Sequence, residues 1–279
     1  MPTGGLKLLS RLPRAERLST ISEGLELLAE NVSTLGDDVE DLLEGGRRRS
    51  VWIVSNHVDE EAAKALILID LVRIDRRDSE ALGRQIARFY SHLARRIYAE
   101  VSQMSPASFA EVRGMVESMR PSHYLDGPND VDWIFPNRLI ADREERLYVD
   151  LVDEDVAGRW VTPGTDDEVR FGGPSSLVRD LVGALQRLGC MSPQGLQIVT
   201  DAWRDQEVEN STHWQVVHGI NSQVIGELQE AELASSELSQ EDVDLVARSW
   251  TFPLGGLDMR QIPISVSELE AEQERWSPY

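Results

Sequence analysis

Two neighbouring stretches carry most of the structural information in this chain: SNHVDEEAAKALILI (residues 55–69) and LGRQIARFYSHLARRIYAE (residues 82–100). Each stretch has the apolar spacing of an α-helix, with hydrophobic residues recurring every three or four positions. Polar and titratable side chains recur at the same intervals, so they also share helix faces. The two stretches therefore predict sequential helices that carry more polar groups than a core helix requires.

The second stretch places basic groups at steps of four residues, which predicts one helix over about 79–103 with these groups on a single face. Arginine binds phosphate oxygens in pairs, and histidine transfers protons near neutral pH. We therefore take three residues as candidate catalytic groups and two as supporting groups: Arg84, Arg88 and His92, with Arg95 and Arg96. The alternative is a solvated helix face, which is the usual role of an arginine-rich stripe.

The first stretch places His57, Glu60, Glu61 and Lys64 on one face, because offsets of three, four and seven residues converge on a helix. These four are candidate supporting residues, and Glu61 is expected either to orient His92 or to pair with Arg88. The alternative for the two glutamates and Lys64 is an internal salt bridge that fixes the register of the helices. For His92 the alternative is a partly buried ring bonded to a carboxylate of the preceding helix.

The flanking sequence extends this pattern to four expected helices, which lie at 21–44, 47–73, 79–103 and 105–120. Gly45–Gly46 is expected to end the first of these, and Ser105–Pro106 to begin the last. Short links between helices favour antiparallel neighbours. The chain from 21 to 120 is thus predicted to form an antiparallel helical bundle, preceded by an N-terminal extension over 1–20.

Residues 121–174 are richer in Pro, Gly and Asp, which is typical of loops. The segments 146–152 and 159–163 are expected to pair as a small β-hairpin, and 162–175 to be a linker. Residues 175–279 are predicted to form an additional acidic helical region, with helices at 175–189, 192–206, 211–234 and 239–250. The fold class expected from the whole sequence is mainly α, a bundle with a small hairpin and this C-terminal region.

Composition limits the classes of function. Residues 1–100 carry a net charge of −2 and residues 101–279 a net charge of −19, which argues against non-specific binding of nucleic acid. The single cysteine, Cys190, excludes an internal disulfide and suits the cytoplasm. No apolar run is long enough to cross a membrane. We found no phosphate-binding glycine loop, nucleophile elbow or zinc-binding His-Glu-x-x-His motif, so no cofactor and no metal is predicted.

One combination of motifs resembles a known family. A helix rich in Leu, Ala and Glu and a Gly-Arg turn precede the Glu-Glu-x-x-Lys-Ala motif, and Phe/Tyr-x-His with basic residues follows it. Further along, Leu147–Asp150 is followed by Gly158, Trp160 and Pro163. In this order and spacing, about residues 20–165 resemble the AbiV family of abortive-infection proteins, within the HEPN helical superfamily.

The resemblance implies a HEPN-like bundle that dimerises and protects against phage by shutting down the infected cell. It also implies a metal-independent ribonuclease, since many relatives are RNases with an Arg and a His separated by a short interval. Here three residues separate Arg88 from His92 and seven separate Arg84 from it, so neither pair has the usual spacing. The implied partners are a second copy of the chain, RNA and a phage protein as the trigger.

Elementary chemistry offers three functions for these residues. In a ribonuclease, His92 would take the proton of the 2′-hydroxyl and an arginine would hold the phosphate charge. In a metal-binding bundle, His57, Glu61 and His92 would meet between helices. In a non-catalytic interaction protein, the bundle would form a dimer and the acidic half would bind a basic partner.

Overall fold

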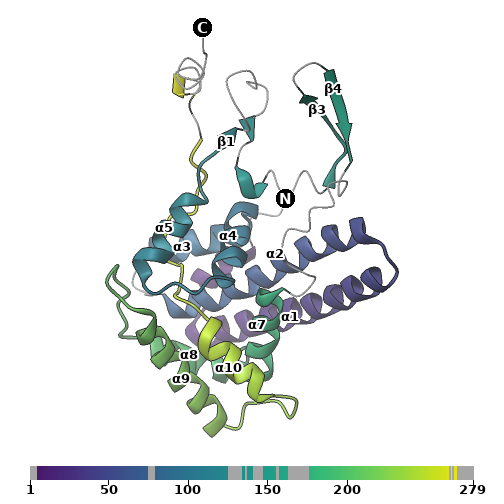
Figure 1. The fold of residues 1–279 in the computed structure, drawn as a ribbon. Coiled ribbons are helices and arrows are strands. Elements are labelled where there is room, and N and C mark those ends of the chain that lie inside the picture. Colours follow the sequence, from purple (N-terminus) through teal and green to yellow (C-terminus); the bar gives the residue numbers. More distant parts are fainter. Residues whose placement is uncertain are drawn as a thin grey trace.

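The computed structural model describes residues 5–74, 79–124, 134–135, 137–140, 147–154, 157–162, 176–263, 265 and 267–268. The protein is mainly helical, as the sequence predicted (Figure 1). A short 3₁₀ helix, η1 (Gly5–Ser10), precedes the long hairpin of α1 (Arg14–Glu44) and α2 (Arg48–Arg73). As expected, α1 ends before Gly45, and Gly46 has a positive φ of 65°. Helix α1 begins at Arg14, which lies within the predicted N-terminal extension over 1–20.

Helix α2 is the centre of the molecule, because it packs against α1, α3, α4, α7 and α8. Almost every residue from Val58 to Arg73 is buried, which is why its sequence is apolar on most sides. Helices α7 (Leu177–Arg187) and α8 (Pro193–Trp203) lie against both α1 and α2. Helix α9 (Trp214–Glu230) packs on α8, and α10 (Gln240–Ser249) packs on α7 and α9.

A close approach at Gly36 joins the N-terminal hairpin to α7. A methyl group at this glycine would lie 2.1 Å from the guanidinium carbon of Arg179. Arg179 crosses α1 here and donates to Asp37 and Glu40 at 3.4 and 3.0 Å. Buried side chains of the two halves of the sequence form one continuous hydrophobic cluster.

The predicted helix over 79–103 is wrong, because the chain breaks there into two helices. Helix α3 (Ser79–Arg88) ends in a turn at Phe89 and Tyr90, and α4 (His92–Ser102) begins after Ser91. The Ser91 hydroxyl accepts the backbone N–H of Ala94 at 3.3 Å, which caps the new helix. The expected alignment of Arg84, Arg88, His92 and Arg96 on one helix face is therefore absent.

One other helix boundary differs from that expected. Helix α5 (Phe109–Ser118) starts at Ser108 rather than at Ser105, because the preceding backbone pairs with a distant segment. Phe109 N–H donates to the Thr212 carbonyl at 3.0 Å, and Trp214 N–H donates to the Ala107 carbonyl at 2.9 Å. The chain from 254 to 263 is irregular, but Leu254, Leu257 and Met259 are buried.

The strands are short and lie outside the helical body (Figure 1). The predicted hairpin is confirmed as β3 (Asp150–Glu154) and β4 (Ala157–Val161), which pair antiparallel with Leu151 opposite Trp160. The two-residue strands β1 (His123–Tyr124) and β2 (Ile134–Phe135) also pair. From 163 to 175, the predicted linker lies outside the described residues.

No helix within the described ranges has both the length and the apolar character needed to cross a membrane.

Candidate functional site

The clearest site-like arrangement joins the start of α4 to the middle of α2. His92 is the first residue of α4, and its Nδ1 lies 2.7 Å from Oε2 of Glu60. The Glu60 side chain is 4% exposed and the His92 side chain is 47% exposed. A carboxylate accepts hydrogen bonds, so it fixes the proton on Nδ1 and leaves Nε2 of the neutral ring as an acceptor. The arrangement is a solvent-accessible imidazole oriented by a buried carboxylate.

Arg95 completes this cluster from the next turn of α4. Its guanidinium lies 3.3 Å from the same Glu60 oxygen, and its Nε donates to the Phe89 carbonyl at 2.9 Å. Arg95 therefore stabilises both the carboxylate and the turn between α3 and α4. We call Glu60, His92 and Arg95 the α2–α4 cluster.

Glu61 does not orient His92, because it faces α1 instead. Its two oxygens bond to Lys64 and to the Asn31 amide of α1, the latter at 3.2 Å. The Lys64 ammonium also lies 5.5 Å from the ring centre of Phe89. Glu61 and Lys64 thus form the internal salt bridge that was the alternative to a direct role in catalysis, and Glu60 is the glutamate that contacts His92.

Arg88 lies in the protein interior and bonds to groups far along the chain. Its residue exposure is 5%, and it donates to the Gln85 side chain at 2.6 Å and to the Leu254 carbonyl at 2.9 Å. It also donates to the Leu257 carbonyl. Arg84, one turn earlier on α3, is exposed. The structure does not bring Arg88 and His92 together as one phosphate-binding and proton-transferring pair.

The two remaining supporting residues also have separate surroundings. Arg96 is buried, donates to Asn56 at 2.7 Å and to Glu100 at 3.2 Å, and lies 3.7 Å from Asp59. His57 is exposed on α2. Within the described part of the chain, no group of three His, Cys, Asp or Glu residues is placed to hold a metal ion. His57, Glu61 and His92 therefore do not meet as the metal-binding alternative expected.

A second polar cluster, next to Arg88, ties α2 to the irregular segment 251–257. Asp70 accepts from Arg73, Tyr98 and the backbone of Leu254 at 2.9, 2.8 and 2.8 Å. Arg73 donates to the Thr251 carbonyl at 2.6 Å. Burial raises the pKa of Tyr98 well above its usual value and lowers the pKa of Arg73. Both pKa shifts arise because burial disfavours the charged forms of Tyr98 and Arg73. The cluster is buried and its hydrogen bonds join α2 to residues 251 and 254, so we assign it a structural role.

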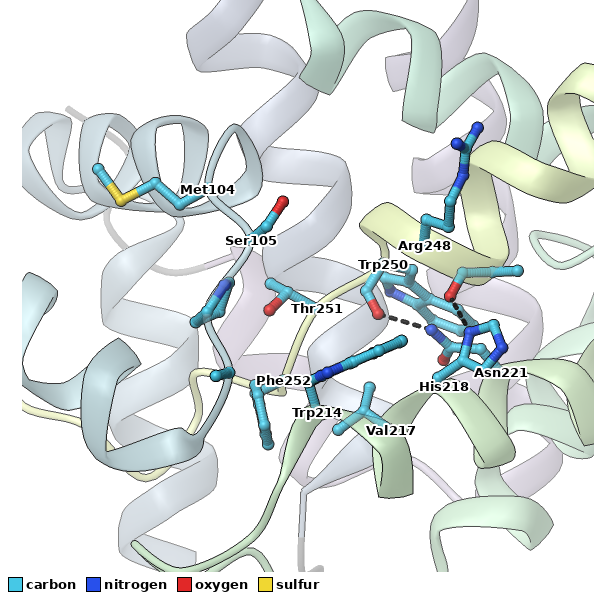
Figure 2. A pocket seen from close by; sticks show the side chains of 13 residues that line it. Met104, Ser105, Trp214, Val217, His218, Asn221, Arg248, Trp250, Thr251 and Phe252 are labelled. Atoms are coloured by element: carbon cyan, nitrogen blue, oxygen red, sulfur yellow. Dashed lines mark hydrogen bonds between the residues drawn. The ribbon is translucent and has the colours of Figure 1, made fainter.

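A pocket of about 280 Å³ lies where α9, the end of α10 and the connection between α4 and α5 meet (Figure 2). Figure 2 shows Met104 and Ser105 on one side and the Trp214 indole facing them from α9. The His218 ring lies beside Trp214, with ring centres 5.3 Å apart and planes tilted by 59°. His218 Nδ1 lies 2.9 Å from the Ala247 carbonyl.

Sequence reasoning did not single out this pocket, because its walls come from three segments far apart in the chain. His218 and Trp214 are four residues apart, so helical spacing already places them on one face of α9. That local signal was present, but a lone histidine on a helix is commonly a packing residue. The partner segment at 104–107 is more than 100 residues away in the sequence.

No protein-family profile, curated protein or solved structure matches this chain.

Proposed function

We propose that this chain is a cytoplasmic defence protein of the abortive-infection type, which acts on RNA or translation, and that His92 is its proton-transferring group. The observation that carries the proposal is the 2.7 Å contact between half-exposed His92 and the buried carboxylate of Glu60. Nucleophile-activating bases are commonly oriented in this way by a third group. The biological setting comes from the family resemblance of residues 20–165.

The chemistry fits cleavage of an RNA phosphodiester. His92 Nε2 takes the proton of the 2′-hydroxyl, and the 2′-oxygen then bonds to phosphorus. The 5′-oxygen of the next nucleotide leaves and takes a proton from water. Arg95 is the cation beside this base, because its guanidinium contacts the same Glu60 oxygen. Arg84, exposed on α3, is the second cation that can reach a bound phosphate from the surface.

The test compares three variants in cells challenged with phage. His92→Ala removes the base, Glu60→Gln removes its charged partner, and His57→Ala is the matched control because His57 is an exposed histidine on the neighbouring helix. His92→Ala should abolish protection and Glu60→Gln should weaken it, while His57→Ala should leave it unchanged. Purified parent protein should cleave RNA in the presence of a chelator. Full protection by a folded His92→Ala variant would overturn the catalytic assignment.

A non-catalytic interaction protein is the second candidate, and one observation favours it. The guanidinium groups of Arg88, Arg95 and Arg96 all bond to groups of the protein itself. An interaction protein would need these arginines only for its structure. In that case His92→Ala would keep phage protection, and the acidic surface would capture a basic partner, such as a phage protein that acts as the trigger.

The proposed assembly is a homodimer formed through the N-terminal bundle. Residues 1–100 are nearly neutral in charge, whereas the rest of the chain repels a second copy. Light scattering of the purified chain should give twice the mass of one chain, 31.3 kDa. A single-chain mass at tens of micromolar protein would count against the dimer.

A further inference from the structure

The pocket described above is separate from the α2–α4 cluster. His92 begins α4, whereas Met104 and Ser105 follow its end, so the helix separates them by about 16 Å at its usual rise. The volume of 280 Å³ is close to the lower end of the range of about 300–1,000 Å³ for small-molecule sites, which is space for a small organic molecule. Its function is therefore independent of the proposed role of His92.

The pocket has a preformed frame. Backbone hydrogen bonds join the connection before α5 to the start of α9, including Trp214 N–H to the Ala107 carbonyl at 2.9 Å. On the opposite side, the Asn221 amide donates to the Trp250 carbonyl at 2.7 Å and holds the end of α10 against α9. Walls fixed from several segments favour binding, because little order has to be gained when a ligand enters.

One wall offers hydrogen-bond acceptors that have no partner in the described structure. His218 Nδ1 must donate to the Ala247 carbonyl, since a carbonyl can only accept. Nε2 of the neutral ring is then an acceptor, and no described group donates to it. One turn further along α9, the Asn221 Oδ1 atom is buried and also lacks a hydrogen-bond partner. Asn221 is 1% exposed and lines the same pocket.

The remaining surface of the pocket is mostly aromatic and apolar. The Trp214 side chain keeps substantial exposure, 39% for the residue, and Pro106, Val217 and Phe252 lie around it. An indole face suits stacking against a flat ring. Arg248 is the one charged residue among the described residues that line the pocket; it is exposed, its Nε donates to the Asp244 carbonyl at 3.1 Å, and no Asp or Glu lines the pocket. A cationic ligand would therefore find no counter-ion in the pocket.

We propose that this pocket binds a planar, uncharged heteroaromatic compound that stacks on Trp214 and donates its ring N–H to Nε2 of His218. The ring centres of Trp214 and His218 are 5.3 Å apart, so one small ring can contact both side chains. The N–H selects against pure hydrocarbons, and the absence of carboxylates selects against ammonium groups.

Calorimetric titration of the full-length chain with three probes tests this assignment. Indole carries the N–H, 1-methylindole has a methyl group in its place, and tryptamine adds an ammonium group. Indole should bind in a one-to-one ratio, and 1-methylindole at least about tenfold more weakly, because an acceptor then stays unpaired. Tryptamine should also bind more weakly than indole.

Variants locate the binding site. Trp214→Ala should weaken indole binding at least about tenfold, a loss typical of a removed stacking partner. Trp160→Ala is the matched control, since Trp160 is 69% exposed on the distant hairpin, and it should bind as the parent does. His218→Leu should bind indole and 1-methylindole equally, and His218→Gln should restore the preference through its amide oxygen.

Two results would overturn the proposal. Equal affinity of the parent for indole and 1-methylindole would remove the N–H recognition. Absence of indole binding up to its solubility limit, or binding that survives in a folded Trp214→Ala variant, would remove the pocket as the site. Circular dichroism of each variant establishes that it is folded, and the partial exposure of Trp214 and His218 favours this.

Discussion

A guanidinium group can bind a ligand or hold the protein together, and its burial decides which role it takes. Arg84 and Arg88 lie one turn apart on α3, and the sequence made them equal candidates. Arg84 is exposed, whereas Arg88 donates to carbonyls of residues 254 and 257 from the interior. The difference comes from a segment almost 170 residues later, which helical spacing cannot reveal.

Replacing Arg88 should therefore destabilise the protein, whereas replacing Arg84 should have almost no effect on stability. Arg88→Ala leaves the Gln85 amide and two buried carbonyls without their donor, and should lower the free energy of unfolding by about 3 kcal/mol. Arg84→Ala changes a surface position and should stay within about 0.5 kcal/mol of the parent. Urea unfolding followed by circular dichroism measures both values. Equal effects of the two substitutions would contradict the assigned roles.

A partly buried ion pair in the C-terminal half predicts a pH dependence of stability. Asp242 accepts two hydrogen bonds from Arg187, at 3.0 and 2.5 Å, and caps α10 together with Ser239. Its pKa is strongly lowered, chiefly by the hydrogen bond from Arg187. A lowered folded-state pKa adds stability above the unfolded pKa of about 3.9, and this stability is lost as the pH falls further.

The Asp242→Asn variant should accordingly be less stable than the parent at pH 7 by about 1–3 kcal/mol. The difference should shrink as the pH falls below about 4, because the unfolded parent then binds a proton on Asp242 that the folded parent does not. Asp244→Asn serves as the control, since Asp244 is an exposed carboxylate on the same helix that accepts from the Gln240 amide at 2.9 Å. Thermal unfolding at a series of pH values reports both. A constant difference down to pH 2 would contradict the role of the Asp242 charge.

At the scale of elements, local signals predicted helices well and tertiary pairing moved their ends. Ser192 and Ser239 cap α8 and α10 at the predicted starts of the helices over 192–206 and 239–250, because a cap depends on the next three residues only. Ser105 was expected to begin α5. The backbone at 107–109 pairs with 212–214 instead, so α5 is capped by Ser108 and begins at Phe109. The contact of Glu60 with His92 could not be predicted for a similar reason. It depends on the break after α3, which places His92 at the start of α4.

The break between α3 and α4 sets the position of His92. Ser91→Ala removes the hydroxyl that accepts the Ala94 N–H, and should cost about 1 kcal/mol of stability. It should also reduce any activity that depends on His92. Ser222→Ala is a suitable comparison, because Ser222 is an exposed residue within α9 that bonds only to its own helix, and it should be neutral. If Ser91→Ala keeps full stability, the cap does not determine the break.

At the scale of the molecule, the helices after residue 176 complete the core that the first helices begin. Helices α7 and α8 cover α1 and α2, and the buried cluster runs through both regions. We expect full-length protein to unfold in one cooperative transition by calorimetry, with equal calorimetric and van't Hoff enthalpies. A fragment ending at residue 174 should expose apolar surface and bind a hydrophobic dye. Two separate transitions, or a stably folded fragment, would show two independent domains instead.

Hydrogen bonds join the segment 251–257 to Asp70, Arg73 and Arg88, and they affect when the protein can fold during its synthesis. These three residues are synthesised well before their partners, which follow 184, 178 and 166 residues later in the chain. Until those partners are synthesised, the acid and the arginines lack their native hydrogen bonds, which is costly in a closed core. The native core can therefore close only after residue 257 has emerged from the ribosome, so a nascent chain stays inactive until that segment has been made.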